Sequence, residues 1–237
     1  MSNVEQLKFQ INEYVDKDKT AFFPRFFKTS EGSYGEGDQF IGVTVPNLRK
    51  VSKNHYKDFD LKETVKLLTE PIHEYRLAAL FILVYKFEKA KNELEKEDIV
   101  NLYLNNVRSV NNWDLVDSSA DKILGPYFFA KDKELLYNFA HSSDLWKQRI
   151  AIISTFYFIK KDHFQDTLDI AKILLNHKHD LIHKAVGWML REIGNRKFNI
   201  EYDFLKDNYK DMPRTMLRYA IEKFEPGLRQ QFLKGYI

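Results

Sequence analysis

The sequence predicts an all-α protein built from helical repeats, and three observations carry that prediction. Apolar residues recur at i, i+3, i+4 and i+7 through most of the 237 residues, as in the segments 75–85 and 150–157. Period-two alternation between hairpin turns, which would indicate β-strands, is absent. A helical pattern also returns at a nearly constant distance along the chain, which is typical of stacked repeats.

The repeat is marked by a basic residue followed by an apolar run. It appears in segments that begin at residues 73, 145, 181 and 212, with the basic residues Arg76, Arg149, Lys184 and Arg218. The separations are 73, 35 and 34 residues, so a further copy is expected near residue 112. A period of about 35 residues with two helices per unit predicts an α-solenoid of the HEAT-like or armadillo type. Corresponding positions of each unit then line one concave face.

Helix boundaries are expected at the residues that start or stop helices. Asp58 and Asp60 precede one helix, and Pro71 separates two others. Later boundaries are expected at 125–126, 142–144 and 194–195. Pro213 and Pro226 suit the first turns of the last helices.

The longest irregular segment is residues 31–46, which contains four glycines. It follows no strand, so it does not fit a phosphate-binding loop. We expect an exposed, mobile connection between helices that can touch a ligand.

Composition excludes several classes of protein. The chain has no cysteine, which removes disulfides, thiolate metal sites and cysteine nucleophiles and favours a reducing compartment. The first 20 residues contain acidic residues where a signal peptide would need a basic start and an apolar run, and no apolar run in the chain is long enough to span a bilayer. We expect a cytoplasmic protein without a membrane partner, folded as a single domain over residues 1–237.

Charge is distributed unevenly along the chain. Residues 145–237 contain 17 Lys/Arg and 11 Asp/Glu, whereas residues 1–144 contain 20 and 23. The second part therefore has the stronger claim to an anionic partner.

The most informative short segment is NWDLVDSS, residues 112–119. Trp113 and Asp117 are four residues apart, so on a helix the indole and the carboxylate are neighbours on one face and can act on one object.

Three motifs are informative together: WDLVD at 113–117, Gln148-Arg149, and the KAxGWxLRE pattern at 184–192. With these motifs the chain resembles the AlkD family of DNA alkylation repair glycosylases, which are built on HEAT-like repeats. The motifs occur in the family's order and at similar distances, and the resemblance covers roughly residues 20–223.

The resemblance implies excision of cationic N3- and N7-alkylated purines from double-stranded DNA, without a metal, a cofactor or a covalent intermediate. It implies that Asp117 is catalytic and that Trp113 and Trp188 line the cleft beside the lesion. Arg149 is expected to hold the DNA backbone there, and Arg191 and Lys184 are further basic positions at the DNA. The resemblance also implies that the base is not drawn into a deep pocket. A DNA cleft in one solenoid needs no dimer, so a monomer is expected.

The chemistry of these residues can be argued separately. An alkylated purine is already cationic and therefore leaves readily, while positive charge develops on the deoxyribose. A carboxylate near the sugar stabilises that charge and can orient or deprotonate water. Aromatic faces attract the cation, and a guanidinium can grip a phosphate through two hydrogen bonds. No lysine is placed for Schiff-base chemistry, so a monofunctional enzyme is expected.

Structural roles for the same residues remain open. Tryptophans on amphipathic helices usually pack in the core, and we expect this for Trp146. Asp114 suits a helix cap better than Asp117 does. Arg149 could form an interhelical salt bridge with Asp117. His179 and His183 are an i, i+4 pair that could bind zinc, although we expect no metal.

The chain departs from the family at Phe26, at Asp180 and Leu181, and in the long glycine-rich segment that begins at Glu31. The N-terminal helix has Phe26 where relatives often have Tyr, which keeps a stacking surface for DNA but loses the hydroxyl. Asp180 and Leu181 replace a pair of aromatic residues found in some members. A competing hypothesis is a catalytically inactive repeat scaffold that binds DNA structures or a protein, but such a scaffold has no need of a carboxylate at Asp117.

Overall fold

Every regular element of the protein is a helix. The computed structural model describes residues 1–237 and contains fifteen α-helices and two short 3-10 helices. The single β-type pairing is an isolated bridge between Gln39 and Ile72. The all-α prediction is therefore confirmed. No helix combines the length and hydrophobicity that crossing a membrane requires.

The chain divides into two compact units, Met1–Ser119 and Ala120–Ile237. Unit 1 contains α1 (Asn3–Asn12), α2 (Lys17–Phe26), α3 (Val45–His55), α4 (Leu61–Leu68), α5 (His73–Lys89), α6 (Glu93–Asn105) and η1 (Val107–Ser109). Helix α7 (Trp113–Phe129) begins in unit 1 and ends in unit 2. Unit 2 continues with α8 (Glu134–His141), α9 (Leu145–Ser154), α10 (Phe156–Lys160), α11 (Gln165–Ile173), α12 (Asp180–Arg196), α13 (Phe198–Asn208), α14 (Arg214–Ala220), η2 (Ile221–Lys223) and α15 (Pro226–Lys234). The single domain expected over residues 1–237 stays a prediction.

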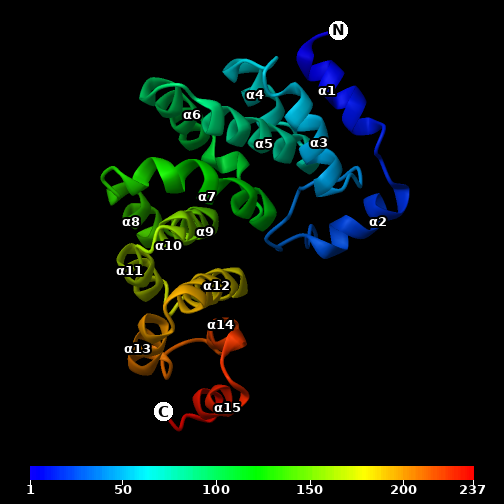
Figure 1. Cartoon of the computed structure of the whole chain (residues 1–237). Coiled ribbons are helices and arrows are strands. Elements are labelled where there is room, and N and C mark those ends of the chain that lie inside the picture. The colour runs from blue at the N-terminus through cyan, green and yellow to red at the C-terminus, as the bar shows by residue number, and fades with distance from the viewer. The chain divides into compact units, whose positions relative to one another are not determined.

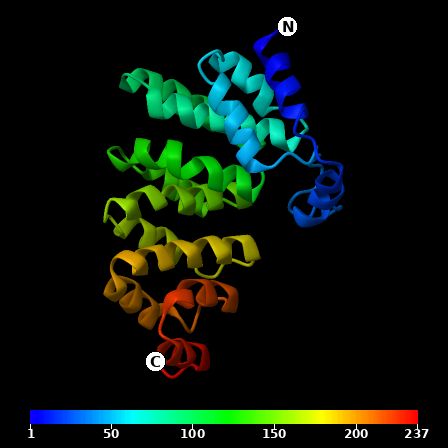
Figure 2. The same ribbon diagram turned by 45° about the vertical axis from the view of Figure 1, so that its right-hand side comes forward.

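The repeat appears as helices that follow one another in pairs (Figures 1 and 2). The pairs are α4 and α5, α6 and α7, α8 and α9, α11 and α12, and α13 and α14. The marker residues each lie on the second helix of a pair: Arg76 on α5, Arg149 on α9, Lys184 on α12 and Arg218 on α14. The copy expected near residue 112 is the start of α7, which is also the second helix of its pair. The predicted helical repeat is confirmed.

Helix α5 is the central helix of unit 1. Each residue from Leu77 to Val84 is at most 3% exposed, because α3, α4 and α6 pack around it. A helix that is covered on all sides has no need of a polar face. This explains the nearly continuous apolar run in the middle of α5.

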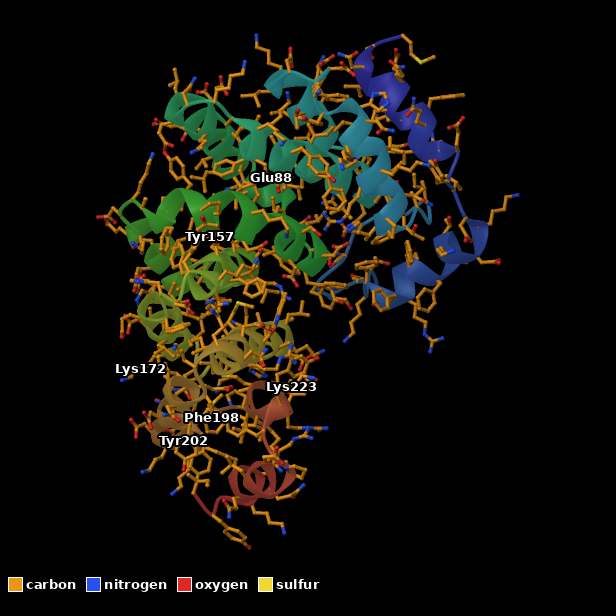
Figure 3. All side chains as sticks on the ribbon, in the orientation of Figure 1. Glu88, Tyr157, Lys172, Phe198, Tyr202 and Lys223 are labelled. Carbon is orange, nitrogen blue, oxygen red and sulfur yellow. The ribbon has the colours of Figure 1, made fainter.

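Helix α12 has the corresponding place in unit 2, where it packs against α9, α13 and α14. A Cβ on Gly187 would lie 2.4 Å from the Met216 carbonyl oxygen and 2.6 Å from the Tyr219 Cβ. Glycine therefore allows α14 to approach α12 closely. On α13, the rings of Phe198 and Tyr202 stack with centroids 5.8 Å apart (Figure 3).

Most of the expected helix boundaries are confirmed. Asp60 and Asp144 cap α4 and α9 with their side chains, and Pro226 is the first residue of α15. Two expectations were wrong, since α7 runs through 125–126 and α12 runs through 194–195. A Cβ on Gly125 would lie 2.6 Å from the Tyr157 Cβ, so this glycine serves close helix packing and does not end the helix.

The glycine-rich segment 31–46 differs from the exposed connection that we expect. In its second half, Phe40 and Val43 are buried, at 7% and 2% exposed. The carboxylate of Glu74 accepts hydrogen bonds from the backbone amides of Ile41, Gly42 and Val43, the shortest of which is 2.8 Å. Burial raises the pKa of Glu74, although these amide bonds act in the opposite direction. The segment is exposed at residues 31–32 and 36–37, whereas Asp38, Phe40 and Val43 are buried, and residues 41–43 are docked on α5 through Glu74.

Candidate functional site

The start of α7 presents Trp113 and Asp117 on one side of the helix, as the sequence predicts. Both side chains are half-buried, whereas Leu115 and Val116 between them are fully buried. The buried Asn112 anchors this end of the helix because its side-chain amide donates a 2.7 Å hydrogen bond to Asp38. This hydrogen bond anchors the start of α7, beside which the indole and the carboxylate lie half-buried.

A cavity of about 330 Å³ lies beside this end of α7. Its lining is mainly aromatic and aliphatic, with a few carboxylates. The lining residues are Phe23, Phe26, Phe27, Phe40, Val43, Val45, Leu48, His73, Glu74, Leu77, Trp113, Asp114, Asp117 and Ser118. Three residues expected at the site, Trp113, Asp117 and Phe26, therefore line the same cavity.

A stack of rings forms the aromatic side of the cavity. Phe27 lies nearly parallel to Trp113, with centroids 5.3 Å apart and an interplanar angle of 18°. Phe40 stacks on Phe27 at 4.7 Å, and His73 lies next in line, 4.6 Å from Phe40. Phe26 meets Trp113 edge-on at 6.0 Å and is half exposed. The indole is therefore held on one side by Phe27 and bordered by Phe26.

Buried charged residues surround His73 at the end of this stack. The ring of His73 bridges two carboxylates, with Nδ1 3.1 Å from Asp38 and Nε2 2.8 Å from Asp114. Burial by itself lowers the pKa of His73, but Asp114 and Asp38 outweigh it and raise that pKa to about 9. Burial acts to raise the pKa of Asp38, yet His73, Arg76 and Asn112 together lower it. The imidazole ring of His73 is therefore protonated at neutral pH, and Asp38 and Asp114 balance its positive charge.

Asp114 has a different role from a simple cap. It lies in the first turn of α7, where a negative charge interacts favourably with the positive end of the helix dipole. Its Oδ2 binds His73, while its Oδ1 is buried without a hydrogen-bond partner. It links α7 to the first turn of α5 and lines the cavity.

In unit 2, Arg149 is only 5% exposed. Its Nη1 donates to the carbonyl oxygen of Leu181, at the start of α12. A guanidinium held in this way ties α9 to α12. The backbone contact that the resemblance implies for Arg149 stays a prediction.

The other expected residues of unit 2 lie along α12. Trp188 is half-buried and donates from Nε1 to Glu192 at 3.0 Å, and its ring lies 5.6 Å from that of Phe156. Lys184 pairs with Asp180 at 2.6 Å, so the acidic departure from the family is bound to a basic position. Arg191 forms an ion pair with Glu222.

The histidines near α12 have structural hydrogen bonds. His177 Nε2 lies 2.8 Å from the side-chain oxygen of Gln148, and His179 caps α12 by accepting from the Leu181 amide. No group of three or more metal-ligating side chains is arranged to hold a metal ion. Trp146, which we expect in the core, is half-buried instead.

Sequence reasoning missed Phe27, Phe40, Asp38 and His73. Phe27 is adjacent to the expected Phe26, but only the structure shows that Phe27 is the ring stacked on Trp113. His73 and Asp38 carry no motif of their own. The only available signal was the position of Arg76, since His73 lies one helical turn before this repeat marker.

Comparison with known proteins agrees with this fold. The family of DNA alkylation repair enzymes matches the chain over residues 7–224. A protein from Enterococcus faecalis described as a predicted DNA alkylation repair enzyme is similar in structure, with a TM-score of 0.70 and 14% identity, over 90% of this chain and 97% of that one. AlkD2 from Streptococcus mutans is similar with a TM-score of 0.55 and 18% identity, over 89% of this chain and 99% of that one. No curated protein has a significantly similar sequence.

The family match covers nearly the whole chain, and both structural relatives share its helical architecture. The resemblance inferred from the three motifs is therefore confirmed, and the chain belongs to the family of DNA alkylation repair enzymes.

Proposed function

We propose that this member of the family is a DNA glycosylase that hydrolyses the N-glycosidic bond of cationic alkylpurines, such as 3-methyladenine and 7-methylguanine, in duplex DNA. One observation carries the proposal: Trp113, Asp117 and Phe26 line the same cavity in unit 1. Family membership supports the role in DNA repair, and this lining supports the choice of chemistry.

The reaction needs little from the protein at the leaving group. The N3- or N7-alkylated purine is cationic, so it departs as a neutral base with the electron pair of the C1′–N bond. The sugar becomes an oxocarbenium-like cation, and water adds to C1′ while its proton passes to a base. Asp117 can stabilise this cation and accept the proton, which leaves an abasic deoxyribose.

The aromatic residues around Asp117 suit a cationic substrate. The face of an indole attracts a cation by roughly 0.5–2 kcal/mol, depending on how far the pair is desolvated. The ring of Phe27 stacks on one face of the Trp113 indole, with centroids 5.3 Å apart. The orientation of the indole is therefore preorganised. The charge of His73 does not oppose the substrate cation because Asp38 and Asp114 both bind that imidazolium.

The roles of the residues in unit 2 remain part of the proposal. The family resemblance gives Trp188 a place at the lesion and gives Arg191 and Lys184 contacts to DNA. The burial of Arg149 and its bond to the Leu181 carbonyl favour a positioning role, through the start of α12, over a direct grip on a phosphate. The proposal also follows the family in leaving the base outside a deep pocket.

The decisive experiment compares base release from methylated duplex DNA by wild type, Asp117→Asn and a control, Asp207→Asn. Asp207 is an exposed residue of α13, so this control removes the same charge outside the cavity. We expect wild type and the control to release both bases, and Asp117→Asn to be slower by about 10²–10³-fold. Binding of Asp117→Asn to DNA should be unchanged or tighter, because a negative charge facing a polyanion is removed.

Two results would contradict the assignment. If Asp117→Asn releases bases at the wild-type rate, Asp117 is not the catalytic carboxylate. If wild type binds DNA but releases neither base, the protein is an inactive repeat scaffold, which is the alternative function from another class.

A further inference from the structure

A second cavity, of about 430 Å³, lies at the C-terminal end of unit 2. Its lining comes from α14, η2 and α15 and consists of Thr215, Arg218, Tyr219, Glu222 and Arg229. Hydroxyl, guanidinium and carboxylate groups predominate, in contrast to the aromatic cavity of unit 1. Arg218 is also the last basic marker of the helical repeat, and the proposed excision chemistry gives it no role.

The walls of this C-terminal cavity are held by buried residues. Met216 and Ile221 are fully buried, and Phe232 of α15 is 1% exposed. The close approach of α14 to α12 at Gly187 fixes the first wall, and the contact between Phe224 and Phe232, with centroids 5.7 Å apart, fixes the second. The polar groups are therefore presented by a packed frame and not by a loose terminus.

The two arginines of the cavity have no carboxylate partner within the 4.0 Å that defines an ion pair. Glu222, the single carboxylate of the lining, instead pairs with Arg191 and lies 4.0 Å from Lys223. Figure 3 labels Lys223, which follows Glu222 on η2. Because Glu222 is already neutralised, it does not cancel the charges of Arg218 and Arg229.

Arg229 has an unmet hydrogen-bonding requirement. Its side chain is half-buried, and its Nε is shielded from solvent without a hydrogen-bond acceptor. A buried N–H without an acceptor is unfavourable. A ligand that brings several acceptor oxygens and negative charge would satisfy it, and a guanidinium fork matches the geometry of phosphate oxygens.

We propose that this cavity binds a phosphate of the DNA backbone, with Arg218 and Arg229 as the main donors and the Tyr219 hydroxyl as a further one. Thr215 forms part of the lining. The proposal rests on the proposed DNA substrate but not on base excision. It adds a contact that positions the duplex without reading its sequence.

The test measures binding of an unmodified, fluorescently labelled duplex by anisotropy at several KCl concentrations. The variants are Arg218→Gln, Arg229→Gln and the double variant, with Lys206→Gln as the control. Lys206 is an exposed residue of α13 outside the cavity lining, so this control removes one positive charge from the same unit. Circular dichroism melting confirms that each variant is folded.

We expect the double variant to bind about tenfold more weakly at moderate salt. The slope of log K against log [KCl] should become shallower by about 0.9, the value for one phosphate. The control should keep the wild-type slope. A further variant, Arg218→Lys, should lose less affinity than Arg218→Gln, because it keeps the positive charge. If the control loses as much affinity as the double variant, or if the double variant binds as wild type does, the proposed subsite is wrong.

A second arm separates a backbone phosphate from free phosphate. Inorganic phosphate is titrated calorimetrically into wild type and the double variant at constant ionic strength. Saturable binding that the double variant loses, together with unchanged duplex binding, would make the cavity a free-anion site and overturn the proposal. A wild type that binds the duplex through Arg218 and Arg229 but releases no base would refute the glycosylase and leave this subsite standing.

Discussion

At the scale of single residues, His73 determines the electrostatics behind the candidate site. It is 2% exposed and binds Asp38 and Asp114 with its two ring nitrogens. Since both partners are carboxylates, each ring nitrogen acts as a donor, which requires the protonated ring. The aromatic stack of Phe40, Phe27 and Trp113 therefore continues to a protonated His73, which is bound by the carboxylates of Asp38 and Asp114.

This arrangement predicts a pH dependence of stability. The pKa of His73 is raised from 6.5 to about 9 in the folded chain, so protonation favours folding. The contribution is complete below about pH 6.5, the unfolded pKa, and is lost as the pH rises through about 9. We expect the free energy of unfolding, measured with urea, to fall by on the order of 3 kcal/mol across that range.

The matched variants for this prediction are His73→Gln and His141→Gln. His141 is exposed at the end of α8, so its replacement should leave the pH profile unchanged. His73→Gln should be less stable at pH 6.5 and should show a flatter profile up to pH 9. A wild-type free energy that stays constant between these pH values contradicts a protonated His73.

At the scale of elements, glycines inside helices decide how closely neighbouring helices pack. Gly125 in α7 approaches α10, and Gly187 in α12 approaches α14. The KAxGW motif therefore contains a packing residue beside its functional candidates. The glycine keeps α14, and with it Arg218, close to α12.

Gly187→Ala is expected to destabilise the protein, because a Cβ would overlap the backbone of Met216 and the Cβ of Tyr219. The penalty should be about 1–3 kcal/mol in the free energy of unfolding, as for other overpacked sites. The control is Gly227→Ala at the start of α15, where no atom lies within 4 Å of the added Cβ. That control should be neutral or slightly stabilising, and equal effects of the two changes would argue against the close approach.

At the scale of the whole molecule, charge differs between the two units. Unit 1 contains 17 Lys/Arg and 19 Asp/Glu, and unit 2 contains 20 and 15, which gives formal charges of −2 and +5. The excess of positive charge lies in the unit that contains the C-terminal cavity with Arg218 and Arg229. Unit 2 is therefore the better candidate for most phosphate contacts, and unit 1 for the carboxylate chemistry.

The whole reaction is expected to need neither a metal nor a lyase step. Base release by wild type should be unchanged by excess EDTA, since water and Asp117 suffice for a cationic leaving group. The DNA strand should remain intact until the abasic site is cleaved by heat or alkali. Strand cleavage by the enzyme alone, or a rate that falls with EDTA and recovers with added metal, would contradict a monofunctional hydrolase.

Several features of this protein follow from the sequence alone because they depend on local spacing. The 3.6-residue periodicity marks the helices, and the recurrence of basic residues about 35 positions apart marks the repeat. The four-residue separation of Trp113 and Asp117 is sufficient to put them on one side of α7, since helix geometry leaves no other arrangement. Capping residues such as Asp60 and Asp144 are recognised for the same reason.

The surroundings of those residues were decided by the tertiary structure. Asp38 meets Asn112 across 74 positions of sequence and His73 across 35, and no local pattern specifies such pairs. The glycines of 125 and 187 look like helix ends or motif letters until the neighbouring backbone is seen. Helical periodicity states which face of a helix is buried, whereas the partner on that face depends on long-range packing. The sequence therefore determined the helices and the Trp113–Asp117 face, and only the fold decided that Phe27, Phe40 and His73 support it.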